Sequence, residues 1–380
     1  MIAIARVVLR EIALDLVEPF AISSGTVSAR RIVLVELRST DGEEGWGECI
    51  AGETPHYSEE TTDTAWWALS RWFAPRLLAA PFADPHELAP RLADGVKGHP
   101  MAKAAIEMAA FDLAARRAGV PLARFLGGTR ETIEVGLSIG LQPRVEDLVA
   151  RALAARDRGY RRIKLKIAPG RDLDRVRAVR EALGPEATLS VDANAAYGLE
   201  DAELFRALDE LGLLMIEQPL AEDDLRRHAL LQRELRTPLC LDESIRSDRD
   251  LEDMIALGSG RALNVKPGRV GGLASSLALH ARARAAGLPI WCGGMLESGI
   301  GRAHNVALAS LPGFVWPGDI SPSRRYWHED VVDPEWTMSD DGRVAVPLDR
   351  PGLGVAVRRD RIEALAVRRL EIDAETPAGA

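Results

Sequence analysis

Hydrophobic and polar residues alternate along the first 60 residues, as in the run RIVLVEL at positions 31–37. A period of two residues is typical of a β-strand with one buried face. Residues 59–126 instead carry apolar side chains at helical spacing, most clearly from 101 to 118. An antiparallel sheet followed by helices predicts an α+β domain over residues 1–127.

After residue 127 the pattern changes to short β-branched runs that alternate with amphipathic helical segments. The predicted strands lie at residues 134–138, 162–167, 188–192, 213–217, 239–242, 262–266, 289–292 and 314–316. The clearest helical patterns lie at 172–183, 199–211 and 272–286. Eight strands with seven intervening helical segments predict a (β/α) barrel over residues 128–324. Residues 325–380 break the pattern and are expected to complete the first domain.

The predicted strand ends carry ionisable residues at a nearly constant interval. Lys166, Asp192, Glu217, Asp242 and Lys266 are 26, 25, 25 and 24 residues apart. This interval is about the length of one strand–loop–helix–loop unit, and barrel active sites lie where the C-terminal strand ends converge. Because surface charge has no reason to keep such a period, these side chains predict a metal site with a lysine on each side.

The three acidic members of this series are hard oxygen ligands. Without a cysteine or a histidine pair, such ligands favour Mg²⁺ or Mn²⁺ over Zn²⁺. A single carboxylate at a strand end is more simply explained as a helix N-cap or a salt bridge. Three at one period reverse that preference. We therefore expect Asp192, Glu217 and Asp242 to hold a divalent cation.

Two lysines on one predicted strand, Lys164 and Lys166, point the same way because they are two residues apart. A solvated strand edge is the plain alternative. Helices cover the outer face of a barrel strand, however, so we expect both lysines to face the central site. Mutual repulsion and burial are expected to lower a lysine pKa, which suits a general base. With Lys266 opposite, this arrangement predicts proton removal next to a carboxylate in a small-molecule substrate.

The overall composition excludes several classes of partner. The 380-residue chain has a formal net charge of −9, with 47% hydrophobic and 28% charged residues. Its lysines and arginines form no basic block, so nucleic acid and anionic membranes are not expected partners. The N-terminus has no signal-peptide pattern, and no apolar run approaches the roughly 20 residues of a membrane helix. Cys49, Cys240 and Cys292 are far apart. Reduced thiols and a cytoplasmic location are expected.

Five short motifs resemble the enolase superfamily in its muconate-lactonizing-enzyme subgroup. They are Lys-x-Lys at 164–166, Asp-Ala-Asn at 192–194, Ile-Glu-Gln-Pro at 216–219, Asp-Glu-Ser at 242–244 and Lys-Pro-Gly-Arg at 266–269. Within that subgroup, two further segments are similar to o-succinylbenzoate synthases and N-succinylamino acid (N-acylamino acid) racemases. These are GGMLESGIGRAHN at 293–305 and PGDIS at 317–321. The resemblance covers nearly the whole chain.

The resemblance implies an α/β fold, a modified (β/α)7β TIM-type barrel with an α+β capping domain. It implies that Asp192, Glu217 and Asp242 bind the metal, Mg²⁺ with Mn²⁺ or Co²⁺ as substitutes, and that Lys166 and Lys266 are an acid/base pair. Lys164 is expected to contact the substrate carboxylate or enolate and to tune Lys166. Expected substrate contacts are Ser138, Asn194, Gly294, Met295 and Leu296, with Phe20 and Tyr57 at lid positions. A homo-oligomer, a dimer or an octamer, is also expected.

Some motif residues have plain structural explanations. The glycine pair at 293–294 fits a tight turn. Asn264 fits a satisfied core amide as well as a contact to the metal ligands. Arg269 is more informative, because an arginine three residues after the second lysine accompanies racemase activity in the family that this chain resembles. Glu297 is expected only to pair within its loop.

These expectations favour racemization of N-succinylamino acids by two-base proton transfer. Formation of o-succinylbenzoate by syn-dehydration, in menaquinone biosynthesis, is expected as a secondary or even the physiological activity. A dipeptide epimerase would carry Asp-x-Asp where this chain has Asp319-Ile320-Ser321, and a muconate cycloisomerase lacks the loop at 293–305. The non-enzyme alternative is a barrel that binds a ligand without catalysis, and the complete set of five ionisable groups argues against it.

Overall fold

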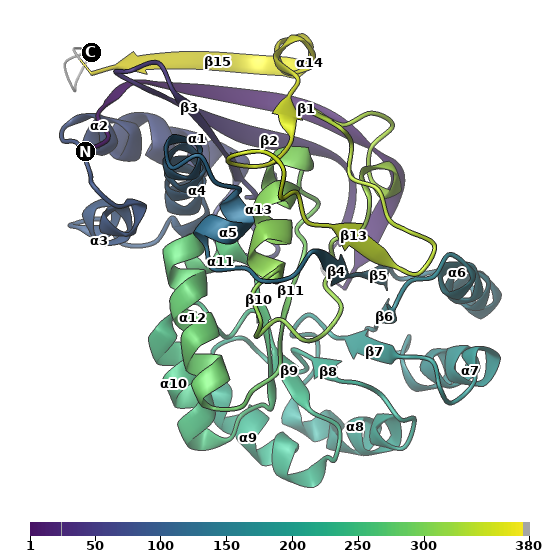
Figure 1. The fold of residues 1–380 in the computed structure, drawn as a ribbon. Coiled ribbons are helices and arrows are strands. Elements are labelled where there is room, and N and C mark those ends of the chain that lie inside the picture. The colour runs from purple at the N-terminus through teal and green to yellow at the C-terminus, as the bar shows by residue number, and fades with distance from the viewer. Residues whose placement is uncertain (24, 375–380) are drawn as a thin grey trace.

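An antiparallel sheet with helices packed against it covers one end of a parallel barrel (Figure 1). The computed structural model describes residues 1–23 and 25–374. This arrangement confirms the predicted barrel with an α+β capping domain. Among the described residues, no helix is both long and apolar enough to cross a membrane.

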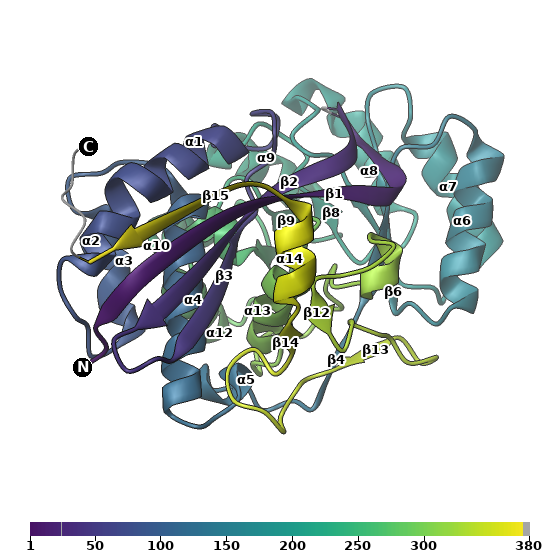
Figure 2. The same ribbon diagram turned by 90° about the horizontal axis from the view of Figure 1, so that it is seen from above.

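The capping sheet has four antiparallel strands in the order β15-β1-β2-β3 (Figure 2). They are β1 (Ile4–Ile22), β2 (Gly25–Ser39), β3 (Glu44–Cys49) and β15 (Ala366–Asp373). The β1–β2 hairpin extends to the barrel, where Leu141 N donates a hydrogen bond of 2.8 Å to Ala21 O. The hairpin therefore joins the sheet to the end of the barrel that carries the predicted site.

Helices pack against the sheet on its barrel side. They are α1 (Thr62–Ala68), α2 (Ala74–Leu78), α3 (Leu88–Ala93), α4 (Pro100–Arg117) and α5 (Leu122–Phe125). The predicted helix at 101–118 is confirmed by α4, most of whose residues are buried. Gly47 on β3 allows this packing, because a Cβ there would lie 2.0 Å from Ala105 O. Only a residue without a side chain lets the sheet approach α4 so closely.

The barrel sheet has seven parallel strands in the order β11-β10-β9-β8-β7-β6-β5. They are β5 (Gly136–Ile139), β6 (Arg162–Lys166), β7 (Leu189–Asp192), β8 (Ile216–Glu217), β9 (Leu239–Leu241), β10 (Ala262–Val265) and β11 (Ile290–Cys292). The connecting helices are α6 (Val145–Asp157), α7 (Leu173–Leu183), α8 (Ala202–Asp209), α9 (Leu225–Glu234), α10 (Asp248–Leu257), α11 (Pro267–Val270), α12 (Leu273–Ala285) and α13 (Gly299–Ala309). Right-handed crossovers through helices are the usual way to connect parallel neighbours.

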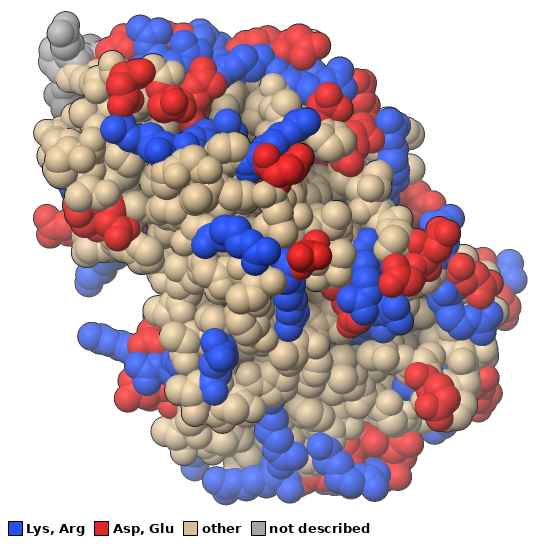
Figure 3. Space-filling model, viewed as in Figure 1, with Lys and Arg blue, Asp and Glu red and all other residues tan. Residues whose placement is uncertain are grey.

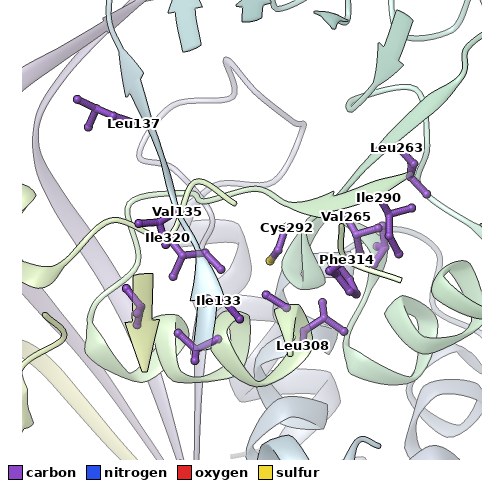
Figure 4. Packing of buried hydrophobic residues seen from close by; sticks show 14 of the residues in the cluster. Ile133, Val135, Leu137, Leu263, Val265, Ile290, Cys292, Leu308, Phe314 and Ile320 are labelled. Atoms are coloured by element: carbon purple, nitrogen blue, oxygen red, sulfur yellow. The ribbon is translucent and has the colours of Figure 1, made fainter. Parts of the chain in front are cut away.

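The predicted eighth strand at 314–316 is not a regular strand. Phe314 forms an isolated parallel bridge with Ile290 of β11, and Gly318 forms another with Val135. These bridges link the two edges of the seven-stranded sheet. Pro317 interrupts regular pairing because it has no N–H to donate. Apolar packing holds the junction together, with Val135, Ile290 and Phe314 in one buried cluster (Figure 4).

The chain after residue 325 contacts both parts of the molecule. It contains β12 (Val332–Asp333), β13 (Arg343–Ala345), β14 (Ala356–Val357) and α14 (Arg359–Leu365) before β15. The strand β13 pairs with β4 (Thr132–Glu134), next to the barrel, whereas β15 pairs with β1 of the capping sheet. Residues 375–380 of the predicted terminal segment lie outside the described residues. The domain boundaries at 127 and 324 stay a prediction.

Charges of both signs lie side by side on the surface. On the face in Figure 3, basic and acidic side chains are interspersed, and no block of one sign covers it. Arg282 on α12 illustrates the pattern, because it lies 2.5 Å from Asp248 on α10. Such exposed pairs contribute at most about 1 kcal/mol each to stability. Buried ion pairs lie in the capping sheet, as between Arg10 and Glu36, and in the barrel, as between Lys164 and Glu217.

Candidate active site

Adjacent strand ends bring the predicted ionisable residues into one row. Lys166 ends β6 opposite Asp192 on β7, and Asp192 lies opposite Glu217 on β8. Asp242 directly follows β9, and Lys266 directly follows β10. The parallel register therefore places these five residues at the same end of the barrel, as their sequence period predicted.

The two lysines of β6 contact the neighbouring carboxylates. Lys166 Nζ lies 2.6 Å from Asp192 Oδ2 and donates to Asn194 Oδ1 at 2.6 Å. Lys164 Nζ lies 2.9 Å from Glu217 Oε2 and 3.2 Å from Asp192 Oδ2. None of these lysine and carboxylate side chains is more than 9% exposed. Their mutual attraction is therefore screened only weakly by solvent.

Tyr57 brings a capping-domain hydroxyl to the second lysine. Lys266 Nζ donates to Tyr57 Oη at 3.1 Å and lies 2.6 Å from Asp242 Oδ2. The tyrosine in turn donates to Asp242 Oδ1 at 3.2 Å. Arg269 also pairs with Asp242 and donates to Asn264 O at 2.6 Å. The sequence-predicted lid residue and Arg269 thus meet at the same carboxylate.

The predicted lowering of a lysine pKa concerned the pair Lys164 and Lys166, and it is wrong for Lys164. Burial opposes the charge on Lys164, but attraction by Asp319 and Glu217 outweighs it and raises the pKa above its ordinary range. Burial also opposes the charge on Lys266, yet Tyr57 and the surrounding carboxylates raise its pKa. Repulsion between the Lys164 and Lys166 ammonium groups by itself would lower the pKa. Three carboxylates within 3.2 Å of the Lys164 ammonium outweigh that repulsion.

Two buried charged residues not predicted from the sequence belong to the site: Asp319 pairs with Lys164, and Arg162 pairs with Asp319. Asp319 Oδ2 lies 2.6 Å from Lys164 Nζ, and Asp319 Oδ1 accepts a 2.5 Å hydrogen bond from Arg162. The guanidinium of Arg162 lies 4.1 Å from the ring centre of Trp291, and the Lys164 ammonium lies 4.7 Å from it. The sequence could have indicated Arg162 as a site residue, because it is two residues before Lys164 on the same strand and therefore points to the same face.

Buried oxygen atoms without hydrogen-bond partners lie beside the carboxylate row. Two of them are Glu243 Oε2 and Asn264 Oδ1. Asn264 Nδ2 donates to Glu217 Oε1 at 2.8 Å, and Asn194 Nδ2 donates to Glu243 Oε1 at 3.0 Å. Unpaired buried oxygen atoms are costly, and a bound cation relieves that cost. Together with three carboxylates, this oxygen-rich donor set fits a hard divalent cation.

The carboxylates are turned towards protein cations as the side chains lie. Within residues 1–23 and 25–374, no three His, Cys, Asp or Glu side chains are grouped to chelate an ion. Asp192 and Asp242 are instead engaged by Lys166 and Lys266. Metal binding therefore requires carboxylate oxygens to exchange an ammonium contact for the ion. The oxygen donors are of the kind that binds a hard divalent cation, but in this structure Asp192 and Asp242 point to the lysines and pair with them.

A cavity of about 450 Å³ lies between the capping domain and the barrel mouth. Ten residues predicted from the sequence line it: Phe20, Tyr57, Ser138, Lys164, Lys166, Asn194, Lys266, Gly294, Met295 and Leu296. The three carboxylates, Asn264 and Arg269 are buried and do not line it. The hydroxyl oxygen of Ser138 is buried without a hydrogen-bond partner. The cavity is thus large enough for a small-molecule substrate and exposes both lysines to it.

Backbone strain is concentrated around this cavity. Five non-glycine residues in the described part of the chain have positive φ, namely His99, Asn194, Ala195, Gln218 and Leu296. All except His99 lie at or directly beside the predicted site. Such conformations cost about 1–3 kcal/mol each and persist where the surroundings enforce them. The loops at the strand ends are therefore held in fixed shapes.

Comparisons with known proteins agree with this geometry. Residues 4–127 match the family described as mandelate racemase / muconate lactonizing enzyme, N-terminal domain. Residues 147–361 match the family described as enolase C-terminal domain-like. A solved structure from Listeria innocua, a member of the enolase superfamily, has a TM-score of 0.95 and 40% sequence identity, covering 99% of this chain and all of that one.

Two curated relatives have equal identity to this chain. An o-succinylbenzoate synthase from Geobacillus kaustophilus is 49% identical over 362 residues, which cover 95% of this chain and 96% of the relative. An N-succinylamino acid racemase from Thermus thermophilus is 49% identical over 355 residues, which cover 93% and 95%. Overall similarity therefore does not separate these two activities.

Proposed function

The chain belongs to the mandelate racemase / muconate lactonizing enzyme family of the enolase superfamily, and we propose that it racemizes N-succinylamino acids and also forms o-succinylbenzoate. Both reactions begin with removal of a proton next to a carboxylate. Relatives of nearly full length carry each of these names at 49% identity. This shared first step makes one site sufficient for two products.

The observation that carries this proposal is a pair of lysines lining one cavity from different strands. Lys166 lies at the end of β6 and Lys266 follows β10, with β7, β8 and β9 between those strands in the sheet. A substrate between the two ammonium groups would present one face of its α-carbon to each. Two-base proton transfer requires that arrangement.

In racemization, one lysine in its neutral form removes the α-proton and the electron pair passes into an enediolate of the substrate. The opposite lysine, as an ammonium group, then donates a proton to the other face of the carbon. Before the ion binds, contacts of 2.6 Å to Asp192 and Asp242 hold the two ammonium groups at the cavity. Lys164 keeps its positive charge, which suits a contact with the substrate carboxylate or the enolate.

We propose that Asp192, Glu217 and Asp242 hold the divalent cation on which the superfamily depends, with Mg²⁺ as the usual ion and Mn²⁺ or Co²⁺ as substitutes. When bound, it supplies positive charge for substrate oxygens and for the negative charge that develops on them. The residues at and beside the site include equal numbers of acidic and basic side chains. The five carboxyl groups are Asp192, Glu217, Asp242, Glu243 and Asp319, and the five cationic groups are Arg162, Lys164, Lys166, Lys266 and Arg269. A divalent ion added to this balance favours an anionic substrate.

Dehydration to o-succinylbenzoate is the second candidate activity, favoured by the Geobacillus relative. One lysine removes the proton and becomes an ammonium group. The C–O bond then breaks, and the same ammonium group returns that proton to the leaving hydroxide on the same face, which releases water and regenerates the neutral lysine. The other lysine remains a cation. Arg269 favours racemization as the main activity, because an arginine three residues after the second lysine accompanies racemase activity in the family that this chain resembles. We also propose a homo-oligomer in the cytoplasm, and a preference for an apolar amino-acid side chain.

Deuterium exchange on separate enantiomers tests the proposal. Each enantiomer of N-succinylmethionine is incubated with the Mg²⁺-loaded enzyme in D₂O and followed by proton NMR and polarimetry. We expect the wild type to racemize both with deuterium incorporation. Lys166→Ala and Lys266→Ala are expected to lose roughly 10²–10⁴-fold in racemization. Each variant should still exchange the α-proton of one enantiomer, and a different one in each case.

The exposed Lys97 provides the control, because Lys97→Ala removes a lysine outside the cavity. It should keep wild-type rates. A wild-type enzyme that incorporates no deuterium would contradict the racemase proposal. Comparison of kcat/KM for N-succinylmethionine and for the hydroxycarboxylate precursor of o-succinylbenzoate then ranks the two activities.

A further inference from the structure

The loop Gly294-Met295-Leu296 forms part of the cavity wall and has an unfavourable backbone shape. Leu296 has a φ of 59°, in the left-handed region that residues with a Cβ rarely adopt. The loop also lies tightly against its neighbours. A Cβ at Gly293 would lie 2.6 Å from Lys266 Cε, and one at Gly294 would lie 2.4 Å from Asp319 O. A loop so close to the lysine needs an anchor that keeps it in this shape.

Glu297 supplies that anchor. Its Oε1 accepts hydrogen bonds of 2.8 Å from Met295 N and of 2.8 Å from Asn305 Nδ2 on α13. Its own carbonyl oxygen accepts 3.0 Å hydrogen bonds from Arg302 and from Trp327. The residue is only 5% exposed. Glu297 is thus fixed from both ends and ties the loop backbone to α13.

The next residue joins the same loop to the capping domain. Glu48 on β3 accepts hydrogen bonds from Ser298 N at 2.9 Å, from Ser298 Oγ at 2.5 Å and from Gly301 N at 2.9 Å. The first turn of α13 therefore cannot move away from the sheet without losing these bonds. Through its hydrogen bond from Met295 N, Glu297 connects this fixed helix end to the loop that forms the cavity wall.

We propose that Glu297 is a positioning residue that sets substrate selectivity through Met295 and Leu296. The inference rests on the proposed function, because it takes the cavity as the substrate site. Glu297 does not line the cavity and accepts no hydrogen bond from a lysine. It acts on the apolar surface that the loop presents to the substrate side chain, and the proton transfers themselves depend on other residues.

Kinetics on substrates of graded size test this assignment. The Mg²⁺-loaded wild type, Glu297→Ala and Glu297→Gln are compared on N-succinyl derivatives of alanine, methionine and phenylalanine. Loss of the acceptor frees the Met295 N–H, so Glu297→Ala should raise KM for the phenylalanine and methionine derivatives about tenfold or more. The alanine derivative should change less than about threefold, and kcat should change little for all three. Glu297→Gln keeps an oxygen acceptor and should restore the wild-type order.

Trp336→Phe is the matched control. It removes the 2.9 Å hydrogen bond from Trp336 Nε1 to Gly299 O, in the first turn of α13, without touching the loop. It should weaken the helix and leave the selectivity order as in the wild type. A selectivity change in Trp336→Phe equal to that in Glu297→Ala, or an equal loss of kcat on all substrates, would overturn the inference. A wild type that turns over no substrate would reject the proposed function and this inference with it, whereas an active wild type with unchanged selectivity in Glu297→Ala rejects the inference alone.

Discussion

Asp319 neutralises two buried cations next to the cavity. Its two carboxylate oxygens lie 2.5 Å from Arg162 and 2.6 Å from Lys164, and the Arg162 side chain is fully buried. Two guanidinium nitrogens of Arg162 have no hydrogen-bond partner, so its charge depends on Asp319 and on the face of Trp291. Among the partners of Lys164, Asp319 is the carboxylate that no metal ion needs. It can therefore hold the lysine whether or not the neighbouring acids bind a cation.

We expect Asp319→Asn to lower the free energy of unfolding by about 3–5 kcal/mol, because it leaves the charge of Arg162 buried without a counter-charge. Urea unfolding measures the loss. Ser321→Ala is the control from the same segment. It removes a 3.4 Å hydrogen bond to Gly136 O and should cost about 1 kcal/mol. Equal losses in the two variants would contradict the buried ion pair as the main effect.

The periodic residues of the site could be predicted from the sequence, and the residues that support them could not. Lys166, Asp192 and Glu217 share a strand register, so their spacing carried the signal. Asp319 lies 157 residues from Arg162 and outside the period. Its partner depends on how the barrel closes, which no local pattern records. The lysine pKa prediction was wrong for the same reason, because it required the distances to carboxylates on other strands.

Helix N-termini of the barrel are capped by acids from the other domain. Glu107 on α4 accepts hydrogen bonds from Leu273 N at 2.5 Å and from Ala274 N at 2.9 Å, at the start of α12. Gly272 permits this approach, because a Cβ there would lie 2.1 Å from the Glu107 carboxylate. Glu48 caps α13 in the same way. Each carboxylate supplies acceptors that the first helical turn lacks, and so docks one domain on the other.

Glu107 should make the stability of the protein depend on pH. Burial raises its pKa to about 8, against partial opposition from the two backbone N–H groups. The folded protein therefore binds more protons than the unfolded chain between the ordinary carboxyl pKa and pH 8. Stability from this residue is present at low pH and falls as pH rises through that window, by up to about 1.4 kcal/mol per pH unit.

The variant Glu107→Gln removes this titration. Urea unfolding of both proteins at pH 5, 6, 7 and 8 should show the free energy of unfolding of the wild type decreasing relative to that of Glu107→Gln as pH rises. Parallel curves would show that the start of α12 keeps the carboxylate ionised throughout. Glutamine keeps one of the two acceptors, and the loss of the other does not depend on pH, so the difference in pH slope isolates the charge.

Elements with a clear period were predicted well, and the junction between them was not. The helix at 101–118 is α4 to within one residue at each end, because its apolar spacing and its end signals agree. The run at 314–316 is apolar enough for a strand. It forms only bridges, since closure of the barrel passes through Pro317 and Gly318 instead of a regular ladder. Whether an apolar run pairs regularly depends on partners distant in the sequence.

The cavity is assembled only when the two domains are joined, because both contribute to its lining. The proposed metal-binding carboxylates lie beside this cavity, and Tyr57 of the capping domain donates a hydrogen bond to one of them, Asp242. An ion bound to them should therefore stabilise the whole molecule. At Mg²⁺ concentrations about 100 times its Kd, we expect a gain of about 2.7 kcal/mol in the free energy of unfolding, which EDTA reverses. Thermal unfolding with and without Mg²⁺ measures it. Asp192→Asn should abolish the shift, and an equal shift in that variant would place the ion elsewhere.

The pairing of β15 with β1 affects how the protein is made. β1 lies between β2 and β15, and its partners in β15 are residues 366–373. Synthesis adds roughly 5–20 residues per second, so one edge of β1 remains open on the ribosome for roughly 20–70 s after its partner β2 has emerged. An open strand edge recruits other strands. We therefore expect nascent chains of this protein to depend on chaperones that shield the edge until the last strand arrives.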